Sequence, residues 1–209
     1  MQRLLMPNDM SRIKILIEGY AHPGKNGSYV ASPSTVLIES KGKKVLVDPG
    51  ANPNLLKVLK KENLTTKDID VVYLTHYHID HILNIRMFPK HVIYDGEIRW
   101  DKDKEFFYQE RLPGTDIEIL PTPGHSTEHT SLVVKNTDKG IVCIAADVFW
   151  WEDGKQKSNT AEDLIDLRDP FVTDAKALRK SREKILKIAD WIIPGHGKIF
   201  KNPSKQLHV

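Results

Sequence analysis

The sequence is poor in cysteine, which excludes disulfide bonds as a source of stability. Cys143 is the single cysteine among the 209 residues, so no disulfide can form within the chain. It lies in the apolar run 141–145, where a buried thiol in a strand is favoured over a reactive one. With 40% hydrophobic residues, the chain is long enough to build one domain with a substantial core.

Long apolar runs and a strong net charge are also missing. No stretch approaches the roughly 18 apolar residues that a membrane-spanning helix requires, and the N-terminal residues lack the pattern of a secretory signal. The 31 Lys and Arg residues barely exceed the 28 Asp and Glu residues, so the charge balance does not compel a nucleic-acid partner. We expect a soluble, cytoplasmic protein without a membrane partner, and the sequence leaves its oligomeric state open.

Proline and glycine are scattered along the chain as turn residues instead of being concentrated in a linker. Since there is also no internal repeat, this distribution favours a single domain over residues 1–209. Two segments have helical spacing: a short one near Leu55 and a long one that Asp169 and Pro170 would begin. Apolar runs bounded by turn residues predict strands at 13–17, 35–39, 44–47, 71–74, 92–94, 117–120, 130–134, 141–145 and 191–193, with residues 41–43 as a hairpin turn.

The densest chemical signal lies directly after the expected strand 71–74. His76, His78, Asp80 and His81 place three imidazoles and one carboxylate within six residues. In an extended loop, residues 76 and 78 project to the same side, and a helix beginning near Ile79 would turn Asp80 and His81 toward a neighbouring position. Zinc binds such nitrogen and oxygen ligands, and three histidines with an open water position form a familiar catalytic set. Two ions would need more ligands than this segment supplies.

Three further residues follow expected strands and could supply those ligands. They are His125, Asp147 and His196. The dense histidine and aspartate signals therefore fall where strands end, so polar loops there can line one common rim. Gly124 and Gly195 precede the two histidines, and we expect them to let the backbone pass close to an ion. Each residue alone would more often cap a loop, but together with residues 76–81 they predict a metal site.

The order of these motifs resembles that of the metallo-β-lactamase superfamily. The likeness consists of H-x-H-x-D-H, then P-G-H, then an aspartate at a strand end, then P-G-H-G, and it extends from about residue 13 to residue 200. Segments 18–20, 147–149, 181–182 and 189–190 further resemble small single-domain members. The resemblance implies an α/β (α+β) fold, the four-layer αββα metallo-β-lactamase sandwich.

The resemblance also implies two divalent metal ions, with zinc expected and iron or manganese compatible with the same ligand types. Asp48 would lie behind the ligands and orient one imidazole through its other ring nitrogen. His129, four residues after His125, would be structural. Of the seven implied ligands, His76, His78 and His125 would bind the first ion, Asp80, His81 and His196 would bind the second, and Asp147 would bridge them.

A metal-dependent hydrolase with a small-molecule substrate is the function that this pattern favours. By the resemblance, a hydroxide bridging the two ions would attack a small ester, thioester or lactone. Asp80 would be the catalytic residue that orients it. Trp150 and Trp151 would either wall the substrate pocket or pack in the core.

Two other functions are weighed against this one. A phosphodiesterase or ribonuclease would have RNA as its partner, and the cationic face of the long helix could contact phosphate, although such a face is more often simply solvated. A metal-binding scaffold without turnover is the third hypothesis, and the intact ligand set argues against it. The cationic residues of the helix are Lys176, Arg179, Lys180, Arg182, Lys184 and Lys187.

Overall fold

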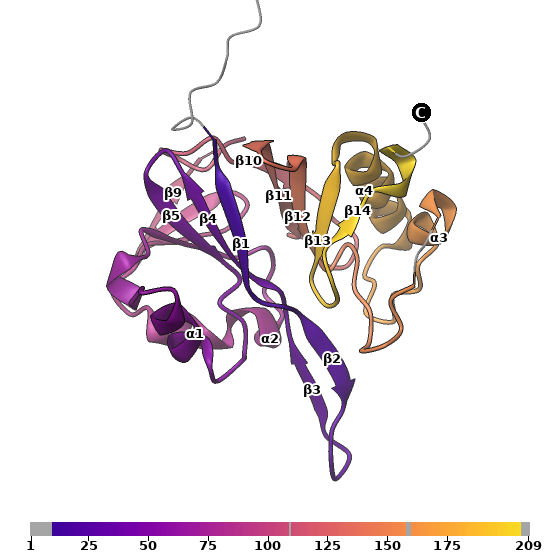
Figure 1. Cartoon of the computed structure of the whole chain (residues 1–209), viewed down its shortest axis with the longest axis horizontal. Coiled ribbons are helices and arrows are strands. Elements are labelled where there is room, and N and C mark those ends of the chain that lie inside the picture. The colour runs from indigo at the N-terminus through magenta and orange to yellow at the C-terminus, as the bar shows by residue number, and fades with distance from the viewer. Residues whose placement is uncertain (1–9, 109, 158–159, 206–209) are drawn as a thin grey trace, which may run out of the picture.

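Two β-sheets packed face to face form the centre of the molecule in the computed structural model of the chain (Figure 1). The structure describes residues 10–108, 110–157 and 160–205. In spatial order, the first sheet contains β1 (Arg12–Ile17), β4 (Thr35–Ser40), β5 (Lys43–Val47), β6 (Val71–Tyr73), β7 (Ile93–Tyr94), β8 (Ile98–Asp101) and β9 (Lys104–Phe107). The second contains β10 (Glu118–Pro121), β11 (Thr130–Thr137), β12 (Gly140–Ala146), β13 (Trp191–Pro194) and β14 (Phe200–Lys201). A separate hairpin of β2 (Tyr20–Pro23) and β3 (Tyr29–Ser32) projects from the sandwich (Figure 1).

The main hydrophobic core lies between the two sheets. Val36 and Tyr73 of the first sheet belong to the same buried cluster as Leu132, Ile144 and Ile193 of the second. All residues of β6 are buried, as expected for a strand that pairs in parallel with a neighbour on each side and is covered on both faces. The apolar runs of the sequence therefore become the inner strands of the sandwich.

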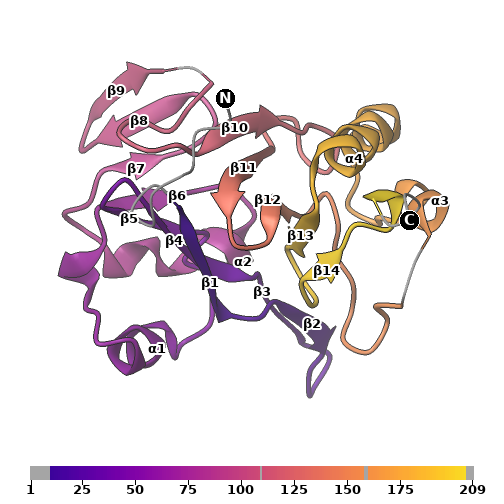
Figure 2. The ribbon, with the colours of Figure 1, turned by 45° about the horizontal axis from the view of Figure 1, so that its top comes forward.

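Helices cover the outer face of each sheet. On the first sheet, Leu55 and Leu59 lie one turn apart on α1 (Leu55–Lys61) and are buried against Leu46. On the second sheet, Leu178 and Ile185 of α4 (Ala175–Ile188) are buried in one cluster with β11, β12 and β13, beside α3 (Ala161–Ile165). Figure 2 shows α1 and α4 on opposite sides of the paired sheets. These layers confirm the predicted αββα sandwich. The remaining helical segments are α2 (Ile79–Ile82) and the 3₁₀ turns Thr66–Asp68, Leu83–Met87 and Pro203–Lys205.

The long helix begins later than the sequence predicted. Asp174, not Asp169, is its N-cap, and Asp174 Oδ1 accepts a hydrogen bond of 2.9 Å from the backbone N–H of Ala177. The prediction was wrong because the Asp169 carboxylate is engaged elsewhere: it accepts from the backbone N–H of Phe171 and faces a histidine of the site described below.

The cationic face of α4 also differs from the expectation of a uniformly solvated surface. Arg182 is buried, and its guanidinium donates to the carbonyl oxygens of Val148, Ile165 and Leu167 at 3.0, 3.1 and 2.6 Å. Arg179 is exposed and forms an ion pair with Asp166. Burial of Arg182 is stable because a planar guanidinium with several donors can satisfy carbonyls from separate segments at once.

Most predicted strands are confirmed, while two hairpins were not predicted. Lys41 and Gly42 form the expected turn between β4 and β5, both with positive φ, 48° and 75°. The hairpins β2–β3 and β8–β9 were not predicted from the sequence because their strands are short and only partly buried. All residues of β9 are exposed to solvent, so no apolar alternation marks it.

The topology brings several strand ends to one edge of the sandwich. Strands β5, β6 and β7 are mutually parallel in the first sheet, and β12 and β13 are parallel in the second. Loops that follow parallel strands leave from the same edge of a sheet, where ligand sites of open α/β sheets are found. No helix within the described ranges is both long enough and apolar enough to cross a bilayer. A single domain over residues 1–209 stays a prediction.

Candidate metal centre

The predicted ligands meet at this edge, although they come from four separate places in the sequence. His76 and His78 follow β6, and α2 begins directly after His78. His125 lies in the loop between β10 and β11, Asp147 directly follows β12, and His196 follows β13. Both sheets therefore contribute, and the constellation exists only when the sandwich is closed.

The seven side chains form two adjacent clusters that could each hold a metal ion. His76, His78, His125 and Asp147 offer ligand atoms that all lie within 4.8 Å of one another, and we refer to them as the first group. Asp80, His81 and His196 meet the same criterion and are the second group.

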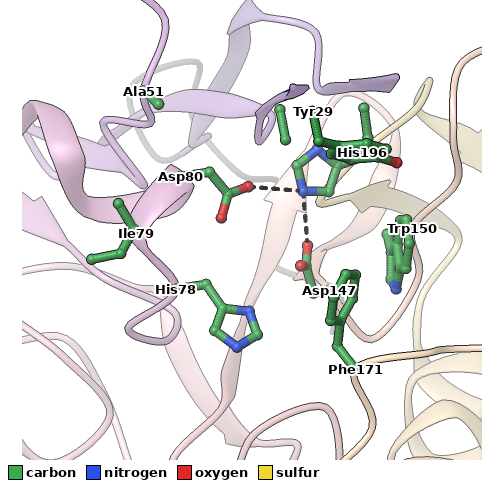
Figure 3. A pocket seen from close by; sticks show the side chains of 11 residues that line it. Tyr29, Ala51, His78, Ile79, Asp80, Asp147, Trp150, Phe171 and His196 are labelled. Atoms are coloured by element: carbon green, nitrogen blue, oxygen red, sulfur yellow. Dashed lines mark ion pairs between the residues drawn. The ribbon is translucent and has the colours of Figure 1, made fainter. Parts of the chain in front are cut away.

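Asp147 lies between the two groups, and each of its carboxylate oxygens faces one of them. Oδ2 is 3.3 Å from His125 Nε2 and 3.8 Å from His76 Nε2. Oδ1 is 3.3 Å from His81 Nε2 and 3.7 Å from His196 Nε2. Figure 3 shows the carboxylates of Asp147 and Asp80 both directed at His196, and Asp80 Oδ2 is 3.3 Å from His196 Nε2. A carboxylate in this position can bind one cation with each oxygen.

Several polar atoms at the centre of the site are buried without a hydrogen bond. His76 Nε2, His81 Nε2 and Asp147 Oδ1 have no hydrogen-bond partner among the described residues. Buried polar atoms are rarely left without a partner, and an unpaired one costs roughly 1–3 kcal/mol. All three atoms are preferred ligand types for zinc or iron, so the donor set fits a pair of divalent ions.

Hydrogen bonds on the far side of three of the histidine rings direct their Nε2 atoms inward. His81 Nδ1 donates to Asp48 Oδ2 at 2.9 Å, the relation that the resemblance implied for Asp48. Asp48 Oδ2 also accepts from the Thr75 hydroxyl at 2.7 Å, which in turn lies 3.1 Å from His76 Nδ1. His196 Nδ1 donates to the Tyr20 carbonyl oxygen at 2.9 Å. With the outer nitrogen protonated, each of these three rings presents the lone pair of Nε2 to the centre, whereas His78 faces His125 Nε2 with its Nδ1, at 3.0 Å.

Asp169 supports His125 in the same way, a role that was not predicted from the sequence. Asp169 Oδ2 accepts from His125 Nδ1 at 2.7 Å, and both side chains are almost completely buried. Its position before Pro170 resembles a helix cap, so the local pattern gave no signal of a contact with a residue 44 positions earlier.

The two glycines make room for neighbouring protein atoms. A Cβ on Gly195 would lie 1.7 Å from Asp147 Oδ1, so this glycine makes room for the carboxylate. A Cβ on Gly124 would lie 2.2 Å from the backbone nitrogen of Leu178, so that glycine allows close packing of its loop on α4. In both cases the glycine allows the backbone to approach other protein atoms, and the expected approach to an ion stays a prediction.

The buried carboxylates create a negative field that favours a cation at this place. Burial by itself would lower the pKa of His81, but the charges of Asp147 and Asp48 outweigh it and hold that pKa well above the usual value. Burial likewise opposes the effect of Asp147 and Asp169 on His125, whose pKa is raised to about 9. For Asp147, burial would raise the pKa, whereas His81 and His196 hold it well below the usual value. His76 has a lowered pKa, first because of burial and then because of neighbouring histidines.

His129, Trp150 and Trp151 lie near the two groups, and for each of them the sequence led to an expectation. His129 is buried, lies 3.0 Å from the Thr122 hydroxyl through Nδ1, and belongs to neither group, as expected for a structural residue. Its pKa is lowered to about 3 by burial. Trp150 borders the cavity described next, while Trp151 packs in the core with Phe200, so each tryptophan follows one of the two alternatives considered.

A cavity of about 420 Å³ opens directly over the two groups. Its floor contains residues of both groups, and its walls come from the β2–β3 hairpin, from α2 and from the segments around Trp150 and Phe171 (Figure 3). The lining residues are Ala21, Tyr29, Ala31, Ala51, His78, Ile79, Asp80, Asp147, Trp150, Phe171 and His196. A cavity of this size is suited to a small molecule.

Comparison with known proteins agrees with this architecture. Residues 29–114 match the family model of the metallo-beta-lactamase superfamily. Metallo-beta-lactamase domain-containing protein 1 of Xenopus laevis is 32% identical over 207 residues, which cover 94% of this chain and 84% of the relative. The chain belongs to the metallo-β-lactamase superfamily.

Solved structures of the superfamily share the fold at low identity. AidC, described as a dizinc quorum-quenching lactonase, superposes with a TM-score of 0.57 at 18% identity and covers 90% of this chain and 85% of its own. The chemotaxis sensor ODP, described with a peroxy diiron species, superposes with a TM-score of 0.65 at 16% identity and covers 96% of this chain and 90% of its own. The predicted enzyme class, a metal-dependent hydrolase without an assigned substrate, is confirmed at the level of this superfamily.

Proposed function

We propose that this protein is a hydrolase with a dinuclear metal centre, zinc being the expected metal, that acts on a small ester, thioester or lactone. The proposal assigns His76, His78 and His125 to one ion, Asp80, His81 and His196 to the other, and Asp147 to both. We also predict that the protein is located in the cytoplasm.

The position of Asp147 is the observation that carries the proposal. One oxygen is 3.3 Å from His125 Nε2 and the other is 3.3 Å from His81 Nε2. A buried carboxylate is costly to desolvate, and two cations, one on each oxygen, would offset that cost. Binding of two cations is the role that we propose for Asp147.

The chemistry divides between the ions and the side chains. Divalent ions bound there would lower the pKa of water to near neutrality and polarise the bond to be cleaved. Asp80 lies on the cavity floor with its side chain 29% exposed, so a carboxylate oxygen can accept a hydrogen bond from the attacking water and orient it. Burial tends to raise the pKa of Asp80, but its hydrogen bond with His196 lowers it, which keeps the group ionised as an acceptor.

The cavity favours a neutral substrate over a phosphodiester. Among the described residues that line it, none is Lys or Arg. Of the six cationic residues of α4 considered for phosphate contact, Arg182 is buried against backbone carbonyls, and the other five are exposed but do not line the cavity. Proteins that bind nucleic acid rely on exposed Lys and Arg for most of their affinity. We therefore do not propose RNA as the substrate.

Elemental analysis combined with a hydrolysis panel tests the proposal. The purified protein should contain two divalent ions per chain and hydrolyse at least one of the neutral ester, thioester and lactone substrates faster than a phosphodiester. His78→Ala should lose metal and activity. His91→Ala is the control, because His91 lies away from both groups and donates to the Thr66 carbonyl oxygen. Equal hydrolysis by the wild type and His78→Ala would refute the proposal.

A further inference from the structure

The walls of the cavity differ from its floor in chemical character, and this difference bears on the kind of substrate. The polar lining residues of the floor all belong to the two metal-binding groups, whereas most of the wall residues are apolar. Tyr29 is the exception, but its hydroxyl donates to Glu152 Oε1 at 3.1 Å, and burial together with Glu152 raises its pKa to about 12. Tyr29 therefore presents mainly its ring to the cavity.

Two large apolar side chains are left exposed beside the metal-binding groups. Ile79 is 67% exposed and stands between His78 and Asp80 in the sequence. Phe171 is 59% exposed, with its ring 5.7 Å from the ring of Trp150 and 6.5 Å from that of His125. Exposed apolar groups on the lining of a cavity lose contact with water when a ligand covers them, which favours an apolar ligand.

The apolar wall also disfavours a charged tail. A substrate with an anionic tail would meet no Lys or Arg among the described residues that line the cavity. A charge buried there without a partner costs desolvation free energy. The wall thus selects against a distal negative charge.

We propose that the substrate carries an uncharged aliphatic acyl chain next to the bond that is cleaved, and that this chain packs against Ile79, Phe171 and Trp150. The inference rests on the proposed hydrolase function for the reaction itself. It concerns specificity: the metal-binding groups hold the reacting end, and the apolar wall selects the chain.

Binding of carboxylates to the metal-loaded protein tests the inference without turnover. Acetate, butyrate, hexanoate and adipate would be titrated by calorimetry. Affinity should increase about two- to fourfold with each methylene that the wall covers, so hexanoate should bind about tenfold or more tightly than acetate, and adipate should bind more weakly than hexanoate. Equal affinities for acetate and hexanoate, or for hexanoate and adipate, would overturn it.

Substitutions in the cavity wall test whether its apolar side chains cause the preference for hexanoate over acetate. Ile79→Ser and Phe171→Ser should each reduce the ratio of hexanoate to acetate affinity severalfold. Phe107→Ser is the matched control and should leave that ratio unchanged, because Phe107 is 76% exposed on β9 and is not among the cavity-lining residues. An equal reduction in all three variants would refute the assignment to this wall.

Hydrolysis of p-nitrophenyl acetate, butyrate and hexanoate separates the two proposals. Both are supported if kcat/KM increases with chain length. If all three esters are hydrolysed at the same kcat/KM, the chain inference fails and the hydrolase proposal stands. If none of these esters and no substrate of the hydrolysis panel is cleaved, the hydrolase proposal fails, and the calorimetric ratios still decide whether the wall binds an aliphatic chain.

Discussion

The two candidate metal-binding groups contain similar residues but are held in place differently. The second group is backed by Asp48, whose carboxylate contacts both His81 and Thr75, and Thr75 leads on to His76 of the first group. The first group is backed by Asp169, whose side-chain contact to the ligands is with His125 alone. Asp48 thus supports both groups, the first of them through Thr75, whereas Asp169 supports the first group alone.

The position of each support in the chain explains this difference. Asp48 follows β5, next to β6 in the same sheet, so its loop lies beside the loop that carries Thr75 and His76. Asp169 comes from the segment between α3 and α4, and Arg182 holds the start of that segment through the Leu167 carbonyl oxygen. The second group therefore depends on sheet geometry and the first on a loop fixed to a helix. The variants below test this distinction, from the largest expected effect to the smallest.

Asp147→Ala should have the largest effect, because it removes the residue that both groups share. We expect both ions to be lost together and hydrolysis to fall to the background rate. Elemental analysis and steady-state kinetics would measure this, with the exposed turn variant Asp103→Ala as control. Retention of one ion at full occupancy would show that the groups are more independent than the distances indicate.

Asp48→Asn should weaken both groups, the second more strongly. Loss of the supporting carboxylate should reduce affinity for the second ion about 10- to 100-fold, with a smaller reduction for the first through Thr75. Asp48 has a φ of 45°, which asparagine tolerates well, so the substitution should not disturb the backbone. Competition with a chelator would resolve two steps, and an unchanged second step would contradict this account.

Asp169→Asn should weaken the first group alone. Its contact with His125 predicts an affinity loss of about 10- to 100-fold for one ion, while the other ion should bind as in the wild type. The same chelator competition measures both steps. If both steps shift equally, the two groups are coupled through Asp147 so strongly that their supports cannot be distinguished.

Arg182→Lys should have the smallest effect on metal binding and a clear effect on stability. A single ammonium cannot reach all three carbonyl oxygens that the guanidinium contacts, so unfolding should require about 1–3 kcal/mol less free energy. The affinity for the first ion should fall only a few-fold. Arg179→Lys on the same helix is the control, since its exposed ion pair should contribute under about 1 kcal/mol. Urea denaturation of both variants would decide the matter.

Much of the fold could be predicted because buried strands appear in the sequence as runs of apolar residues. The inner strands β4, β5, β6 and β12 are recognisable as apolar runs, and the turn at Lys41 and Gly42 is recognisable from its residues. Exposed elements such as β9 lack such a pattern, because a strand with both faces in solvent does not need alternating apolar and polar residues. The start of α4 was misplaced because Asp169 before Pro170 satisfies the local rule for a cap while its carboxylate is bound to a distant ring.

For the site, the sequence by itself determined the type of chemistry. Three histidines and an aspartate within residues 76–81 set the ligand types. Local backbone geometry places these side chains near one another, because they are only a few residues apart in the chain. The order of the motifs also indicated His125, Asp147 and His196 as further candidate ligands, but only the tertiary structure showed how they are arranged around residues 76–81 and that Asp169 supports His125. The positions of Asp147, Asp169 and His196 around that segment depend on how two sheets pack, and the free energy of that packing comes from the whole buried core, not from the residues that flank each ligand.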